Sequence, residues 1–240
     1  MPNSSTHRPA NPGSLQFPDT AIDEGLRQYM LRVYNYMGGG LVLTAVVAYA
    51  AAASGLYAAL YGTLIFWLII LAPLALVLLL GFRIHKMSLG AAQTAFWTYA
   101  GLVGVSLAGL FLAYTGASIA QTFFIAAAMF LSMSLYGYST GRDLTRLGSI
   151  LFMGLIGLVV ASVVNLFLGS SGLQFAISMV GVIVFTGLTA WDTQRIRDMY
   201  FADADETIAG KSAIMGALAL YLDFLNLFLM LMQLMGRRRD

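Results

Sequence analysis

The chain has 240 residues, of which 59% are apolar and only 10% are charged, and its mean hydropathy is +0.80. Soluble domains carry about 25% charged residues, so this composition excludes a soluble globular class and defines an integral membrane protein. The net charge of +2 comes from basic residues in the connections, so it reports on topology, and no nucleic-acid partner is expected. The absence of cysteine excludes disulfides, iron–sulfur clusters and cysteine nucleophiles.

Residues 1–25 are polar and hold four of the five prolines, so we expect a disordered tail without a hydrophobic signal peptide. Apolar runs then predict seven transmembrane helices within one domain, residues 26–240. The predicted spans are Val33–Ala53, Tyr61–Phe82, Ala91–Tyr114, Ile119–Tyr138, Leu147–Leu168, Leu173–Trp191 and Ser212–Gly236. The predicted fold class is therefore an all-α integral membrane bundle.

The seventh apolar run carries one acid, Asp223, which would lie about 16 Å along a helix that starts at Ser212, near the middle of the bilayer. A carboxylate there costs at least ~2.5 kcal/mol, so it should face protein or water. On a helical wheel, small and polar residues gather with Asp223 in a sector of about 100°. The seam-lining residues predicted from this sector are Gly216, Ala219, Asn226, Met230 and Gln233. Small residues admit close helix packing, so we expect the rest of the chain to wrap this helix.

The basic residues of the connections predict the orientation. With a cytoplasmic N-terminus, nine of them lie inside and the uncharged turns lie outside. The nine are Arg27, Arg32, Arg83, Lys86, Arg142, Arg146, Arg195, Arg197 and Lys211. Arg237, Arg238 and Arg239 would then lie outside, where we interpret them as a headgroup anchor. A re-entrant seventh helix, which would return these arginines to the cytoplasm, is the alternative.

Asp192 closes the sixth run, so it and Asp223 place two carboxylates on consecutive helices. Two carboxylates within a few ångströms cannot easily both ionise, so such a pair would share a proton and respond to physiological pH. Unprotonated, its oxygens would hold a calcium ion transiently, and protonated, or bridged to a cation such as Arg83, it would close the seam. The alternatives are that Asp192 is interfacial or pairs with Arg195 or Arg197, and that Asp223 is a structural hydrogen-bonding residue.

An enzyme is not expected. An intramembrane protease would also use two aspartates, but the residues before Asp223 do not form the Gly-x-Gly motif of presenilin-type proteases. The two histidines are too few for a zinc site. Asp203, Asp205 and Glu206 are interpreted as a solvated acidic loop, because they lack the glycine and distal glutamate of a calcium loop. No cofactor is expected beyond a transient calcium ion.

Two runs carry a family resemblance. GLTAWDTQRIRDMY (Gly187 to Tyr200) and IMGALALYLDFLNLFLMLMQLMGRRRD (Ile214 to Asp240) closely resemble the Bax inhibitor-1 family, also called the transmembrane Bax inhibitor motif family, especially its bacterial branch. The resemblance covers essentially residues 25–240. It implies six helices surrounding a central seventh, a cation leak that favours calcium, and pH gating through a di-aspartyl pair.

The family's two aspartates map onto Asp192 and Asp223, and its basic latch on the second helix maps by position onto Arg83. The resemblance thus implies a pH-sensitive calcium (cation) leak channel, with the lipid bilayer and calcium as partners, in a bacterial inner (plasma) membrane. An acid found on the second helix of some members has no counterpart between Phe66 and Phe82, which bears on ion selectivity. Some bacterial relatives modulate a membrane-anchored ATP-dependent protease, so the alternative is a regulatory membrane protein that binds such a protease.

Overall fold

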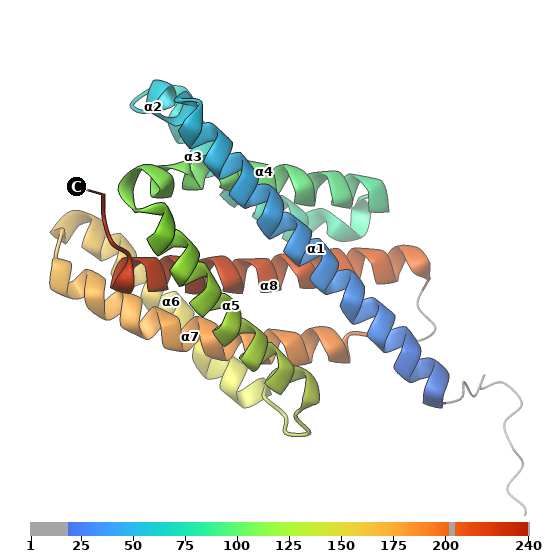
Figure 1. Ribbon diagram of the computed structural model, residues 1–240. Helices are drawn as coiled ribbons and strands as arrows, with labels where there is room; N and C mark the ends of the chain where they lie inside the picture. The colour runs from blue at the N-terminus through green and yellow to red at the C-terminus, as the bar shows by residue number, and fades with distance from the viewer. Residues whose placement is uncertain (1–18, 202–204, 240) are drawn as a thin grey trace, which may run out of the picture.

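The computed structural model describes residues 19–201 and 205–239, and every long element within them is an α-helix (Figure 1). The elements are α1 (Asp19–Ala53), α2 (Leu56–Leu60), α3 (Leu64–Arg83), the 3-10 turn η1 (Ile84–Lys86), α4 (Leu89–Ala113), α5 (Gly116–Ser139), α6 (Thr145–Leu168), α7 (Ser171–Asp198) and α8 (Glu206–Met235). Seven of these helices, all except α2, are long and apolar enough to cross a membrane. The predicted all-α class with seven spans is confirmed.

The helices extend further than the apolar runs at the charged end of the bundle. α1 begins at Asp19, so residues 19–25, which the sequence assigns to the tail, are helical. Residues 1–18 lie outside the described residues, and a disordered tail there stays a prediction. α7 continues to Asp198, and α8 begins at Glu206. Hydropathy marks where a helix leaves the bilayer, whereas its hydrogen bonds continue beyond that boundary.

Polar residues in the short connections fix where the helices begin. Thr63, Ser88, Thr115 and Ser170 each accept a backbone N–H from the first turn of α3, α4, α5 and α7, respectively. Such caps satisfy backbone donors that the helix itself leaves free. Gly169 ends α6 in the left-handed region with φ of 60°, which glycine adopts without steric cost.

α8 lies at the centre of the bundle. In its most apolar window 67% of the residues are buried, against 17% for both α3 and α6. α1, α4, α5 and α7 contact α8 directly, whereas α3 packs mainly on α4 and α6 mainly on α7 (Figure 1). The predicted central C-terminal helix is confirmed, and the six helices around it form an inner and an outer layer.

α1 and α8 run in the same direction along the bundle, and α1 crosses α8 obliquely (Figure 1). Arg32 Nη2, near the start of α1, lies 3.0 Å from Glu206 Oε1 at the start of α8, and Thr44 Oγ1 lies 2.6 Å from the Tyr221 hydroxyl further along both helices. α8 is unbroken over 30 residues, so it crosses the bundle instead of turning back within it, contrary to the re-entrant alternative. The described ends of the chain therefore lie at opposite ends of the bundle (Figure 1). A cytoplasmic N-terminus stays a prediction.

Glycines allow close contact between α5 and α7. Gly137 on α5 faces the backbone of Ala190 on α7, and a Cβ at Gly137 would overlap the Ala190 carbonyl. On α6, a Cβ at Gly148 would overlap the ring of Trp191. Small residues let membrane helices approach to backbone contact, which gains dispersion energy in a solvent as apolar as the side chains. These two close approaches hold α7 at Ala190 and Trp191, directly before Asp192.

Tyr221→Phe is expected to lower the free energy of unfolding by about 1 kcal/mol. Thr44 donates its single proton to the Ala100 carbonyl at 2.9 Å, so the buried Tyr221 hydroxyl donates to Thr44. The substitution removes the Tyr221 hydroxyl and with it this hydrogen bond between α1 and α8. Unfolding in detergent measures the loss, with Tyr61→Phe as the control, because Tyr61 is largely exposed. Equal losses in the two variants would contradict the buried hydrogen bond.

Candidate functional site

The structure brings the two predicted acids together where α7 meets α8. The carboxyl groups of Asp192 and Asp223 lie close enough to affect one another's charge. Asp223 is 5% exposed, and the Asp192 side chain is 13% exposed. Among the described residues, Asp223 Oδ2 is buried without a hydrogen-bond partner. A buried carboxyl oxygen in that position needs a proton, a water molecule or a cation, because leaving it unpaired is costly.

A basic side chain lies beside the pair on the charged side of the bundle. Arg195 Nη1 lies 3.9 Å from Asp192 Oδ1, and the Arg195 guanidinium lies 5.4 Å from the centre of the Trp191 ring. The predicted alternative, an ion pair between Asp192 and Arg195, is thus present together with the carboxyl pair. Arg197 instead pairs with Asp198 at 2.9 Å.

Arg83, the predicted latch, lies apart from the two acids. It is the last residue of α3, it is exposed, and it forms no ion pair within the part of the chain that the structure describes. α3 packs mainly on α4, on the outside of the bundle. A latch formed by Arg83 therefore requires a conformation in which α3 moves toward α7 and α8.

The predicted seam on α8 faces α7 over most of its length. The contacts are Gly216 with Ile196, Met230 with Gly181, and Gln233 with Ser178, whose hydroxyl donates to Gln233 Oε1 at 2.7 Å. Ala219 and Asn226 are half-buried, and the Asn226 amide donates to the Leu222 carbonyl of its own helix at 2.9 Å. Side chains thus fill the seam on both sides of Asp223.

A cavity of about 370 Å³ opens at the charged end of the bundle beside Arg195, the ion-pair partner of Asp192. Its lining also includes Trp191, Gln194 and Asp198, but not Asp192. In the described ranges, no group of three or more His, Asp or Glu residues comes together to hold a metal ion. A calcium ion at the pair would therefore take most of its ligands from carbonyls and water, which suits passage better than permanent binding.

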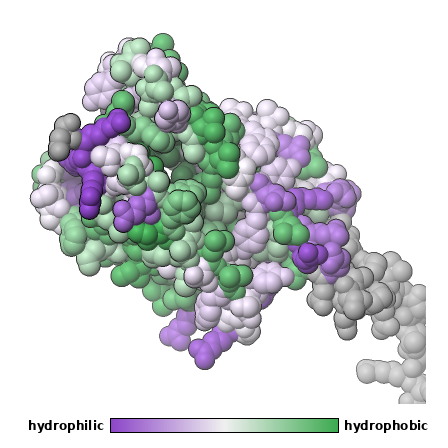
Figure 2. All heavy atoms as spheres, viewed as in Figure 1, coloured by the Kyte–Doolittle hydropathy of each residue, from purple (hydrophilic) through white to green (hydrophobic). Residues whose placement is uncertain are grey.

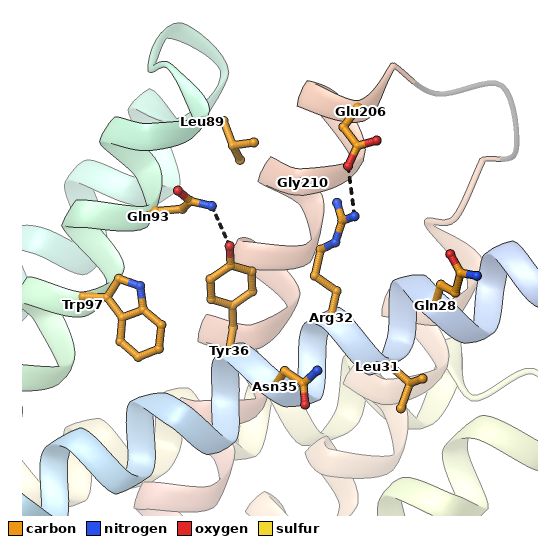
Figure 3. Close-up of a pocket in the computed structure, with 10 residues that line it drawn as sticks. All are labelled: Gln28, Leu31, Arg32, Asn35, Tyr36, Leu89, Gln93, Trp97, Glu206 and Gly210. Carbon is orange, nitrogen blue, oxygen red and sulfur yellow. Dashed lines mark hydrogen bonds and ion pairs between the residues drawn. The ribbon is translucent and has the colours of Figure 1, made fainter.

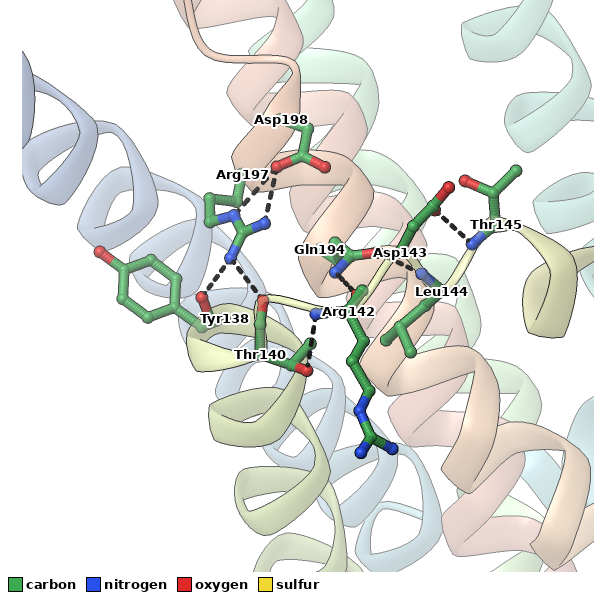
Figure 4. Close-up of polar contacts among 9 residues, drawn as sticks. All are labelled: Tyr138, Thr140, Arg142, Asp143, Leu144, Thr145, Gln194, Arg197 and Asp198. Carbon is green, nitrogen blue, oxygen red and sulfur yellow. Dashed lines mark hydrogen bonds and ion pairs between the residues drawn. The ribbon is translucent and has the colours of Figure 1, made fainter.

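The end of α7 that carries its acid is fastened to the connection between α5 and α6 (Figure 4). Gln194 accepts a hydrogen bond from the Leu144 backbone N–H and donates one to the Arg142 carbonyl, both at 2.8 Å. Arg197 Nη1 donates to the Tyr138 carbonyl at 2.6 Å. The role of Gln194 could not be predicted from the sequence, because its partners come from a segment about fifty positions earlier in the chain.

A chain of hydroxyl groups lies beside the pair and was also missed. The Tyr34 hydroxyl lies 2.5 Å from Ser134 Oγ, which lies 3.0 Å from Thr193 Oγ1. Thr193 in turn donates to the Thr189 carbonyl at 2.7 Å. These bonds join α1, α5 and α7 at Thr193, the residue after Asp192, and so add to the restraint on that end of α7.

A second cavity at the charged end, of about 580 Å³, lies between α1, α4 and α8 (Figure 3). Its polar groups pair with one another: Arg32 with Glu206 at 3.0 Å, and the Gln93 amide with the Tyr36 hydroxyl at 2.6 Å. Glu206, interpreted from the sequence as a solvated loop residue, instead begins α8, and Asp205 is its N-cap residue. Asp203 lies outside the described residues.

Seven helices that are long and apolar enough to cross a membrane define a multi-pass membrane protein, and its central helix carries an acid close to a second acid on α7. The model of a protein family described as "Inhibitor of apoptosis-promoting Bax1" matches residues 26–240. The chain belongs to this Bax inhibitor-1 family, which confirms the resemblance.

Bacterial relatives match almost the whole chain. The uncharacterized protein RP147 of Rickettsia prowazekii is 53% identical over 220 residues, which cover 91% of this chain and 93% of that protein. The inner membrane protein YbhL of Escherichia coli K12 is 48% identical over 219 residues, or 90% of this chain and 94% of YbhL. An uncharacterized protein of Caulobacter vibrioides is 41% identical and covers 92% of this chain and 93% of its own length.

Proposed function

We propose that the protein is a pH-sensitive calcium (cation) leak channel of a bacterial inner membrane, gated by Asp192 and Asp223. The observation that supports this most is the unpartnered, buried Oδ2 of Asp223 opposite a second carboxyl group. An acid inside a membrane span is expensive and therefore indicates a function by default. The location follows from the relative YbhL, which is named an inner membrane protein.

The proton of the pair is the gate in this proposal. With one proton between them, the two carboxyl groups attract one another and α7 stays against α8. Without it, two negative charges a few ångströms apart repel each other and attract a cation, and hard carboxylate oxygens favour calcium. A cation would reach the pair from the charged end of the bundle, where the Asp192 side chain is 13% exposed. The contacts of Met230 and Gln233 with α7 close the other end, so passage requires these contacts to separate.

The test is calcium flux into dye-loaded liposomes that carry the purified full chain, from about pH 6 to about pH 8. We expect flux above that of protein-free liposomes, and we expect it to change with pH. Arg83→Ala tests whether Arg83 is the latch of the carboxyl pair. If the flux and its pH profile stay unchanged in this variant, Arg83 has no part in gating.

Absence of flux at every pH would overturn the channel and favour the regulatory alternative. Deleting residues 1–18 then distinguishes the two roles, because this deletion stops before α1 begins at Asp19. A channel should keep its flux, whereas a regulator that binds a protease through its tail should lose that binding.

A further inference from the structure

An apolar groove opens on the side of the bundle between α1 and α5, away from the carboxyl pair. Its volume is about 380 Å³, and its floor is formed by Phe224, Leu225 and Phe228 of α8. In the space-filling view, the surface there is apolar and hollowed (Figure 2). Thr44 is the one polar side chain in the lining, and its hydroxyl already bonds to Ala100 and Tyr221. The groove therefore offers a place for a hydrocarbon chain and no hydrogen bonds for a polar ligand.

The C-terminal residues lie at one end of this groove. They form an antiparallel bridge with the connection between α4 and α5. Arg238 lies opposite Tyr114 in this bridge. The Thr115 backbone N–H donates to the Arg237 carbonyl at 3.1 Å, and the Arg239 backbone N–H donates to the Ala113 carbonyl at 2.9 Å. The Arg237 backbone N–H also donates to Ser118 Oγ at 2.8 Å. Arg239 Nη1 also donates to the carbonyl of Phe111 at 3.0 Å, and Phe111 lines the groove. Backbone bonds thus hold three arginines beside an apolar cleft.

These arginines have no acidic partner in the described part of the chain. All three are exposed, and none forms an ion pair there. The connections at this end of the bundle, residues 54–63, 114–115 and 169–170, contain no acid. Asp240 follows them in the sequence and lies outside the described residues. Among the described residues, no acid competes with an external anion for these three arginines.

We propose that the groove holds one acyl chain of an anionic phospholipid, whose phosphate is bound by Arg237, Arg238 and Arg239. Guanidinium groups bind phosphate through paired, charge-assisted hydrogen bonds. The first turn of α5 lies at the same end, since Gly116 lines the groove, and the N-terminus of a helix favours an anion. A free phosphate would leave the groove empty, and a neutral lipid would leave the arginines without a counter-charge. One anionic lipid fits both features.

This site goes beyond the proposed channel, because it lies on the opposite side of α8 from the seam. The bound chain would contact Phe224, the neighbour of Asp223 in the sequence. An anionic lipid would therefore contact the helix that carries the central acid.

The test uses the purified full chain in a mild detergent, titrated with phosphatidylglycerol or with phosphatidylcholine of the same acyl chains. Native mass spectrometry counts the bound lipids. We expect phosphatidylglycerol to bind roughly tenfold or more tightly, because each arginine near the headgroup adds attraction. The triple variant R237Q/R238Q/R239Q keeps the backbone bridge and should reduce phosphatidylglycerol binding to the phosphatidylcholine level. The control K86Q/R142Q/R146Q, in which three exposed cations of the other end are neutralised, should keep the preference.

A second variant tests the groove itself. Ala45→Phe with Ala120→Phe places two rings on exposed positions of its walls, so the core is not disturbed. It should lose the tightly held lipid of either headgroup, whereas Ala50→Phe, on the exposed surface of α1 outside the groove, should retain it. Equal affinity for the two lipids in the unaltered protein would overturn the proposal. Undiminished lipid binding to the variant with Ala45→Phe and Ala120→Phe would also overturn it. So would a dimer of the unaltered protein that this variant no longer forms, because a second copy of the chain would then be the occupant of the groove.

Discussion

Asp223→Asn is expected to give a folded protein whose calcium flux no longer changes with pH between about pH 6 and about pH 8. The amide has the shape of the carboxyl group but cannot exchange a proton. Asp223 is the more buried member of the pair, and its Oδ2 has no hydrogen-bond partner in the described residues, so it depends most on the shared proton. Asp192→Asn should flatten the profile as well, because the proton belongs to the pair and not to either residue.

The matched control is Asp198→Asn. Asp198 lies on the same helix as Asp192, but it is exposed and pairs with Arg197. This variant also removes one carboxylate from α7, and it should show the pH profile of the unaltered protein. Size-exclusion chromatography and the midpoint of thermal unfolding in detergent show that each variant is folded. A profile of unaltered shape in either pair variant would exclude the gate and leave Asp223 as a buried structural residue.

Gly137→Ala is expected to lower the free energy of unfolding by about 3 kcal/mol. The new methyl group would overlap the backbone carbonyl of Ala190, which cannot rotate away as a side chain can. α5 and α7 would have to separate, next to the helical turn that carries Asp192. The midpoint of unfolding in detergent measures the loss.

Gly157→Ala on α6 is the matched control. Gly157 is exposed, and nothing lies within 4 Å of the position that its Cβ would take. Alanine favours the helix over glycine by up to about 1 kcal/mol, so this variant should be neutral or slightly more stable. Similar midpoints for Gly137→Ala and Gly157→Ala would show that α5 and α7 do not meet at backbone distance.

The spans and the central position of α8 could be predicted because both follow from the bilayer. Its thickness sets the length of each apolar run, and its low polarity requires the helix that carries Asp223 to lie inside the protein. The short helix α2, the start of α1 at Asp19 and the extension of α7 were not predicted. Residues 19–25 and 192–198 are polar, and their helical structure depends on backbone bonds that hydropathy does not report.

The acids of the site could be predicted because ionisable residues are rare in such a sequence, but their surroundings could not. The helical wheel showed that Gly216, Met230 and Gln233 share a face with Asp223, without showing that α7 covers it. Gln194 was missed because its partners are distant in the sequence. The family resemblance directed attention to Arg83 as the cation of the site, whereas the ordinary helical spacing of three residues places Arg195 beside Asp192.

α8 lies at the centre of the packed bundle although it is synthesised after the helices that surround it. α8 leaves the ribosome after α1 to α7, whereas domains generally tend to fold from the N-terminus as they are synthesised. Until it inserts, α1, α4, α5 and α7 have no core to close upon, and their small and polar faces meet lipid or one another. The core of the bundle therefore forms only once α8 is in place, and a chain that stops before Ser212 would have the surrounding helices without the central one.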